Sequence, residues 1–292
     1  MKDDMAQPRA EAHTFFKRLV SALVMIPPVL GAIYYGYPAF DLLIMLGFII
    51  LAYEWMNLCG TKLFKADAII FYTIGLVALV LASRSQIALS VATLSSGAFY
   101  LFVVFFIGKK SNSSRTDQAS QVSMQPPWLA IGFVYIGFST FFLILLRHEH
   151  QAGFNIIILI FLVAWAADTG AYAFGRLIGG PKLAPVLSPN KTWAGFIGGV
   201  GCAALVGVGF ALIVKESAFL VLVFGAAILG IISQCGDLLE SHIKRQFQVK
   251  DAGSIIPGHG GLLDRVDSLL AMSWAFGLLY FLAREEVIKW MT

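Results

Sequence analysis

Long runs of apolar residues separated by short polar segments dominate this sequence. Several runs approach the ~20 residues that a helix needs to cross a bilayer. We expect about nine spans, at residues 19–36, 38–57, 66–83, 86–107, 128–146, 154–174, 193–214, 217–236 and 266–283. The pattern therefore predicts an all-α polytopic membrane protein with about nine transmembrane helices.

The composition excludes an ordinary soluble domain. Of the 292 residues, 58% are hydrophobic and only 13% are charged, and the mean hydropathy is +0.79. Soluble domains carry about twice that charged fraction. The net charge of +4 is better explained by basic cytoplasmic loops than by nucleic-acid binding. We therefore expect the lipid bilayer, and no nucleic acid, as a partner.

The distribution of basic residues predicts an orientation. With the N-terminus in the cytoplasm, 16 of the 21 lysines and arginines fall on the inside and five on the outside. Cytoplasmic loops of membrane proteins carry such an excess. The two loops richest in polar residues, 175–192 and 237–265, then face the cytoplasm.

A polar segment of low complexity, residues 109–127, divides the chain. We expect it to be a flexible linker without catalytic residues. It separates an N-terminal membrane region of about four spans, 1–108, from a C-terminal region of about five spans, 128–292. Nearly all candidate chemistry lies in the C-terminal region.

A first candidate group follows the eighth span. If that span continues as a helix, Asp237, Glu240, Ser241 and Lys244 lie at i, i+3, i+4 and i+7 on one face. This face offers two carboxylates for a cation and an ammonium for a phosphate. A solvated helix end with an internal ion pair is an equally acceptable interpretation.

A second group precedes and begins the last span. The run from Gly258 through His259, Gly260 and Gly261 cannot form a regular helix, and its glycines let the backbone approach a ligand closely. Asp264 and Asp267 lie one helical turn later. A helix cap explains one of these aspartates but not both. Together with Asp237 they could share one or two Mg²⁺ ions. Cations for a polyphosphate are available nearby, at Lys244, Arg245, Lys250 and Arg265.

A third group lies in and after the sixth span. Asp168 stands in an otherwise apolar segment, where a carboxylate marks a functional site or an ion pair that holds helices together. Donors for a phosphate or a base follow at the start of the seventh span, at Ser188, Asn190, Lys191 and Thr192. Lys191 could equally be an interfacial anchor.

Small residues recur every four positions along the seventh span. They are Gly195, Gly199, Ala203, Gly207 and Ala211. This stripe indicates close helix packing or a dimer contact, and we assign no chemistry to it.

These motifs resemble the signature of the phosphatidate cytidylyltransferases, also called CDP-diacylglycerol synthases. The resemblance rests on a run from Ser241-x-Ile-Lys244-Arg245 through Lys250-Asp251 and Pro257-Gly258-His259-Gly260-Gly261 to Asp264-Arg265-Val-Asp267. Further matches include Glu54-Trp55, Trp165-x-x-Asp168-Thr169-Gly170 and Ser188-Pro189-x-Lys191-Thr192-Trp193. Two positions depart from the family pattern: it usually has a second lysine where Asn190 stands, and often an acid where Ala194 stands.

The resemblance implies that CTP and phosphatidic acid react to give CDP-diacylglycerol and pyrophosphate. It implies Mg²⁺ as cofactor, with a second cation as an option, and a homodimer in a bacterial-type inner membrane with its active site facing the cytoplasm. By motif match, Asp237 and Asp264 are the best metal ligands, with Asp267 nearby and Asp168 in support. Lys244, Arg245, Lys250 and Arg265 would bind the phosphates, and His259 would donate a hydrogen bond to one of them. Asp251, in the same motif, is counted among the catalytic residues.

Three other interpretations remain open at this stage. Nucleotidyl transfer to a different lipid phosphate would use the same residues. An ion-coupled transporter would distribute carboxylates through the membrane depth, whereas these cluster at one predicted face. A purely structural scaffold leaves the polar segment at 250–268 unexplained.

Overall fold

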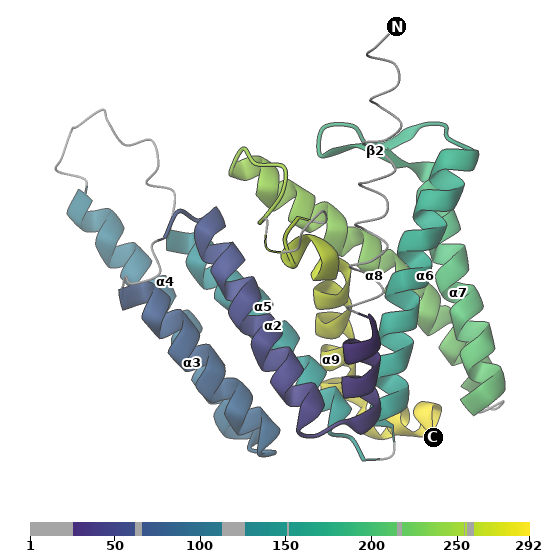
Figure 1. Ribbon diagram of the computed structural model, residues 1–292, viewed down its shortest axis with the longest axis horizontal. Coiled ribbons are helices and arrows are strands. Elements are labelled where there is room, and N and C mark those ends of the chain that lie inside the picture. Colours follow the sequence, from purple (N-terminus) through teal and green to yellow (C-terminus); the bar gives the residue numbers. More distant parts are fainter. Residues whose placement is uncertain are drawn as a thin grey trace, which may run out of the picture.

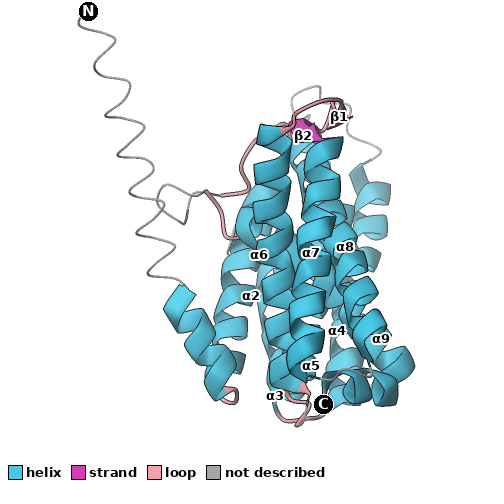
Figure 2. Cartoon of the chain, turned by 90° about the vertical axis from the view of Figure 1, so that its right-hand side faces the viewer, coloured by secondary structure: helices cyan, strands magenta, loops and turns pink. Residues whose placement is uncertain are grey.

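The computed structural model of this chain describes residues 26–61, 66–112, 126–150, 152–214, 218–253, 255 and 260–292. Within these residues, eight helices are long and apolar enough to span a membrane, and a shorter apolar helix, Ile26–Tyr35, precedes them. Figures 1 and 2 show the helices gathered into one bundle. The predicted fold class is therefore confirmed. Of the first predicted span, residues 19–25 lie outside the described part.

The long helices follow the apolar runs closely. Their bounds are α2 Ala39–Leu58, α3 Ala66–Ser83, α4 Ile87–Asn112, α5 Pro126–Arg147, α6 Gly153–Leu177, α7 Trp193–Val214, α8 Phe219–Gln246 and α9 Leu263–Met291. Helices dominate because a lipid environment offers the backbone no partners, so each N–H and C=O must be satisfied within the segment.

The helix ends differ from the predicted ones where the chain becomes polar. Helix α4 continues to Asn112, so the first residues of the expected linker are helical, and residues 113–125 lie outside the described part. Helix α8 continues ten residues past the predicted end at 236, without a break, to Gln246. Hydropathy detects only the apolar part of such a helix. This extension places Asp237, Glu240, Ser241 and Lys244 on α8, as the helical spacing requires.

The segment 175–192 is not a simple loop. It contains a small antiparallel sheet of β1 (Lys182–Ala184) and β2 (Ser188–Thr192), in which Lys182 pairs with Thr192 and Ala184 with Ser188. The protein is thus nearly, rather than entirely, α-helical. Pro189 lies in β2, where the missing N–H is tolerated because both strands of a two-stranded sheet are edges.

Helix α9 lies centrally in the bundle (Figure 1) and contacts α2, α5, α6 and α8. Helix α2 is fixed against α5 by Trp55, whose indole Nε1 donates to the carbonyl of Trp128 at 2.8 Å. Trp55 is fully buried. The N-terminal helices are therefore packed directly onto the C-terminal ones.

The small residues of α7 make close contacts within the chain. A Cβ on Gly199 would lie 2.7 Å from the carbonyl oxygen of Ala167 on α6, and one on Gly207 would lie 2.6 Å from that of Leu222 on α8. Only glycine allows this approach of three backbones. Of the two interpretations of the stripe, the structure supports close helix packing within one chain.

Candidate active site

A cavity of about 900 Å³ opens where the β1–β2 hairpin, α6, α8 and the start of α9 meet. Five acidic and four basic side chains line it. The charged and polar lining comprises Asp168, Tyr172, Arg176, Asn190, Lys191, Thr192, Gln234, Asp237, Glu240, Lys244, Asp264, Arg265 and Asp267. An apolar part of the wall comprises Ile26, Val29, Phe161, Trp165, Leu262 and Val266, among others.

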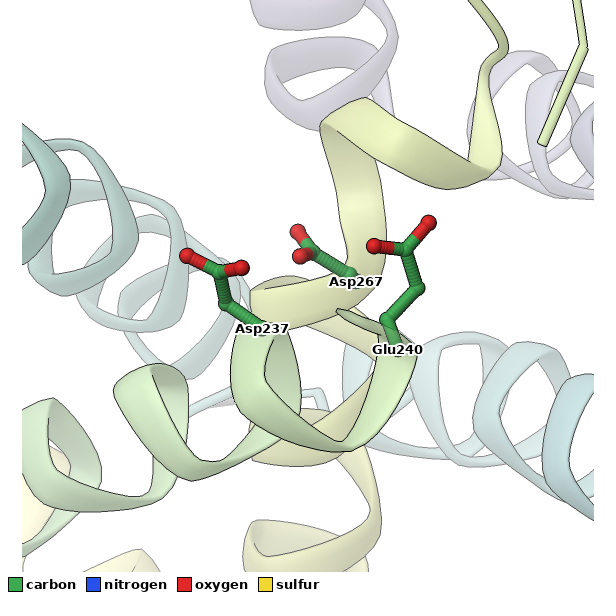
Figure 3. A group of neighbouring side chains, drawn as sticks. All are labelled: Asp237, Glu240 and Asp267. Atoms are coloured by element: carbon green, nitrogen blue, oxygen red, sulfur yellow. The ribbon is translucent and has the colours of Figure 1, made fainter. Parts of the chain in front are cut away.

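Three carboxylates converge at the crossing of α8 and α9. Asp237 and Glu240 come from α8 and Asp267 from the beginning of α9, and one oxygen of each lies within 4.8 Å of those of the others. Figure 3 shows the three side chains next to one another at this crossing. Glu240 and Asp267 are buried, with 3% and 8% of their surface exposed. Three carboxylates at such distances repel one another unless a cation or a proton lies among them.

The arrangement fits a divalent metal ion. Carboxylate oxygens are the ligands that Mg²⁺ prefers, and the ion completes its coordination with water and phosphate oxygens. Glu240 Oε1 is buried and has no hydrogen-bond partner, so it is available as a ligand. We regard Asp237, Glu240 and Asp267 as the residues best placed to hold the metal.

Lysines neutralise part of this charge. Lys244 Nζ lies between two carboxylates, 2.6 Å from Glu240 Oε2 and 2.7 Å from Asp264 Oδ1. Lys191, on the hairpin, reaches Asp237 Oδ2 at 2.5 Å. The hairpin is thereby connected to α8 through the carboxylate cluster.

Asp264 has a different environment from the three clustered carboxylates. Its oxygens accept hydrogen bonds from the amide of Ala252, at 3.1 and 3.2 Å, and from the amide of Gly261 at 3.0 Å. With Lys244 added, both oxygens already have donors. In this structure Asp264 holds the segment before α9 and orients Lys244.

Side chains from α6 and the hairpin form the remaining polar wall. Asp168 lies on α6 within electrostatic range of Asp237, Lys191 and Arg265. Arg176 donates to the hydroxyl of Tyr172 at 2.7 Å. Thr192 Oγ1 accepts from the amide of Gly195 at 3.1 Å, which caps the start of α7.

The structure brings half of the predicted site residues to one cavity. The predicted residues that line it are Asp168, Asn190, Lys191, Thr192, Asp237, Lys244, Asp264, Arg265 and Asp267. Those described outside its lining are Ser188, Ser241, Arg245, Lys250, Asp251, Gly260 and Gly261. Gly258 and His259 lie outside the described residues.

Some residues outside the lining have evident local contacts. Arg245 donates to the carbonyl of Val249 at 3.3 Å. Gly260 has φ +88°, a conformation that favours glycine, and Gly261 donates to Asp264. Their predicted roles toward the substrates stay predictions.

Sequence reasoning missed Gln234 and Tyr172 as lining residues. Gln234 Nε2 donates to the carbonyl of Phe196 at 3.0 Å, so it also fixes α8 to α7. Its position three residues before Asp237, one helical turn away, was the available signal. The i+3 spacing from Asp237 did point to Glu240, which now completes the cluster.

Comparisons with known proteins show the family to which this chain belongs. A model described as the cytidylyltransferase family matches residues 16–283. A phosphatidate cytidylyltransferase of Brucella suis is 50% identical over 153 residues, 52% of this chain and 56% of the relative. The Brucella abortus protein of that name is 46% identical over 165 residues, 56% of this chain and 60% of the relative.

A longer alignment links the chain to a phosphatidate cytidylyltransferase of Staphylococcus aureus. It is 36% identical over 220 residues, 74% of this chain and 80% of that protein. The alignments to the Brucella proteins span less than two thirds of their length. The family match, in contrast, runs through nearly all the described helices. This chain belongs to the cytidylyltransferase family.

Proposed function

We propose that this protein is a phosphatidate cytidylyltransferase, which converts CTP and phosphatidic acid into CDP-diacylglycerol and pyrophosphate. The observation that carries the proposal is the cavity in which three clustered carboxylates face four basic side chains at one end of a bundle of apolar helices. The names of the similar Brucella and Staphylococcus proteins support the same activity.

The reaction needs little chemistry from side chains. A phosphate oxygen of phosphatidic acid attacks the α-phosphorus of CTP, and the bond from that phosphorus to the pyrophosphate oxygen breaks. The attacking oxygen is already anionic, so no general base is required. The obstacle is the repulsion between two highly charged substrates.

The basic side chains of the cavity reduce this repulsion by neutralising phosphate charge. Lys191, Lys244, Arg176 and Arg265 come from the hairpin, α8, α6 and α9, so they surround the phosphates from several directions. Arginine and lysine bind phosphate through charge-assisted hydrogen bonds. These residues hold the two substrates in reacting orientation, which accounts for most of the catalysis in phosphoryl-type transfer.

We propose that Asp237, Glu240 and Asp267 hold Mg²⁺, with Asp168 and Asp264 in supporting positions. The ion would offset phosphate charge and help to align the in-line displacement. A second cation in the same carboxylate-rich cavity is part of the proposal.

The apolar wall suits the lipid substrate. Ile26 and Val29, from the helix Ile26–Tyr35, and Phe161 and Trp165, from α6, are lining residues. Such a surface can contact the glycerol and the first methylenes of the acyl chains while the phosphate reaches the basic residues. We further propose that the cavity faces the cytoplasm of a bacterial inner membrane and that the protein acts as a homodimer.

The direct test is a turnover assay with purified protein in lipid–detergent micelles. With CTP, phosphatidic acid and Mg²⁺, we expect pyrophosphate release that needs both substrates, together with CDP-diacylglycerol. Removal of divalent metal with EDTA should abolish turnover, and added Mg²⁺ should restore it. Folded protein that is inactive with phosphatidic acid but active with an isoprenyl phosphate would transfer the proposal to that substrate. Inactivity with both would refute it.

A further inference from the structure

Glu54 is a buried carboxylate at the end of α2 that does not line the cavity. Only 1% of its surface is exposed, although α2 belongs to the half of the chain that carries few polar residues. A buried carboxylate is costly unless its oxygens are hydrogen-bonded. Its contacts therefore indicate what it does.

Both oxygens of Glu54 bind the backbone at the start of α9. Oε1 accepts from the amide of Leu262 and Oε2 from the amide of Leu263, each at 2.8 Å. Leu262 is the N-cap of α9 and its own side chain forms no capping hydrogen bond. Helix N-termini have unsatisfied amides and a partial positive charge. Glu54 supplies from another helix the anionic cap that α9 lacks.

The same carboxylate packs against the segment that precedes α9. A Cβ on Gly253 would lie 2.7 Å from Glu54 Oε1, and one on Gly261 would lie 2.9 Å from both oxygens. Two points that lie eight residues apart in the chain are thus held against one side chain. Neither glycine could be replaced without displacing Glu54.

This contact leads directly to the carboxylates of the cavity. Gly261, which Glu54 contacts, donates to Asp264, and Asp264 binds Lys244. Asp264 and Asp267 lie in the first two turns of α9, just after the two amides that Glu54 binds. A shift of the start of α9 would move these aspartates relative to Glu240 and Asp237 on α8.

We propose that Glu54 is a positioning residue of the active site. It fixes the first turn of α9 so that Asp267 stays beside Asp237 and Glu240, and Asp264 stays beside Lys244. The N-terminal helices then contribute to catalysis and do not serve only as a membrane anchor. The inference deepens the proposed function, on which its kinetic part rests.

The test compares Glu54→Ala and Glu54→Gln with Asp41→Asn. Asp41 is a matched control because it is also on α2 and also 1% exposed, but it binds His148 rather than α9. Two measurements do not depend on turnover: hydrogen–deuterium exchange of peptides that contain Leu262 and Leu263, and Mn²⁺ binding followed by electron paramagnetic resonance. They decide the role of Glu54 even if the proposed reaction is wrong.

We expect Glu54→Ala to accelerate exchange at Leu262 and Leu263 and to weaken Mn²⁺ binding about tenfold, as for other residues that orient metal ligands. In the turnover assay kcat should fall about 10–100-fold. KM for CTP should change little, because the phosphate-binding residues remain. Glu54→Gln keeps one acceptor oxygen and should be intermediate. Asp41→Asn should match the wild type in all three measurements.

Two results would overturn the proposal. One is wild-type exchange and Mn²⁺ binding in Glu54→Ala. The other applies if Glu54→Ala does not fold, in which case Glu54→Gln is the deciding variant. If Glu54→Gln then behaves like Asp41→Asn in all three measurements, Glu54 does not position the site.

Discussion

Both ends of the helix bundle bury charged side chains, but they use them differently. The site end carries Asp237, Glu240 and Asp267 around the cavity. The far end carries Asp41, at the start of α2, and Glu149, just after α5. Asp41 and Glu54 lie 13 positions apart on α2, so at about 1.5 Å per residue the two ends are separated by about 20 Å.

At the far end each acid has a donor of its own, although Asp41 Oδ1 is buried without a hydrogen-bond partner. Asp41 Oδ2 lies 2.8 Å from His148 Nε2, which joins α2 to the end of α5. Glu149 accepts hydrogen bonds from Tyr280 and, at 2.9 and 3.1 Å, from Arg284, both on α9. Each acid has its own donor from another segment of the chain, so these groups stabilise helix packing.

The site end gathers more carboxylates than its internal pairs neutralise. Lys244 is shared between two acids, and Asp267 accepts from the backbone amide of Ser268 at 2.8 Å. The difference teaches that burial of a charge does not identify a functional site. Convergence of several like charges on a cavity is a stronger indication, because such an arrangement favours a bound cation or a proton.

The strongest test of this contrast is Asp267→Asn, with Asp237→Asn as a parallel variant. Each removes one negative charge from the proposed metal-binding group. Because residues that merely orient a ligand already change activity about 10–100-fold, we expect a loss of about 100-fold or more. The assay measures CDP-diacylglycerol formation, with Glu286→Gln on the exposed part of α9 as control. Near-normal activity in both variants would refute the metal assignment.

Lys244→Met should have the next largest effect. It leaves Glu240 and Asp264 buried without their shared cation, and removal of one partner of a buried ion pair costs about 3–5 kcal/mol. We expect a lower melting temperature and reduced turnover. Lys244→Arg keeps the charge and serves as the control. If Lys244→Met melts like the wild type, the lysine does not hold these acids together.

At the far end, Asp41→Asn should affect stability and leave catalysis unchanged. It weakens one hydrogen bond between α2 and α5, which contributes about 1 kcal/mol. A small decrease in melting temperature with wild-type kcat is expected. A large loss of kcat would show that the two ends are coupled and that the contrast between them is wrong.

Lys289→Ala should have the smallest effect. Lys289 pairs with Glu286 at 2.7 Å on α9, and both side chains are more than half exposed. Surface ion pairs of this kind contribute little to stability. We expect no measurable change in melting temperature or turnover. A clear change in either would indicate that this surface has a partner in the assembled protein.

Much of the site was predictable because it is local in sequence. Helical spacing brought Asp237, Glu240 and Lys244 to one face of α8, and it placed Asp264 and Asp267 one turn apart. The spacing did not reveal that Asp264 is occupied by backbone amides. That depends on the path of the chain before α9.

The sequence by itself determined the helices and the faces that they present. Hydropathy is enough to locate the helices, because an apolar segment in lipid must satisfy its backbone hydrogen bonds internally. The helical period is enough to show which residues share a face. The sequence also indicated an orientation, through its basic residues, that awaits a topology measurement.

Tertiary structure alone decided which distant residues meet. Glu54 binds amides 208 residues away, and Lys191 reaches Asp237 from the hairpin. No local pattern encodes such pairs, because they follow from how whole helices pack. Helix α7 packs against α6 and α8 through small residues, and α2 packs against α5 through Trp55. This packing decides which distant residues come into contact, and so it creates the cavity.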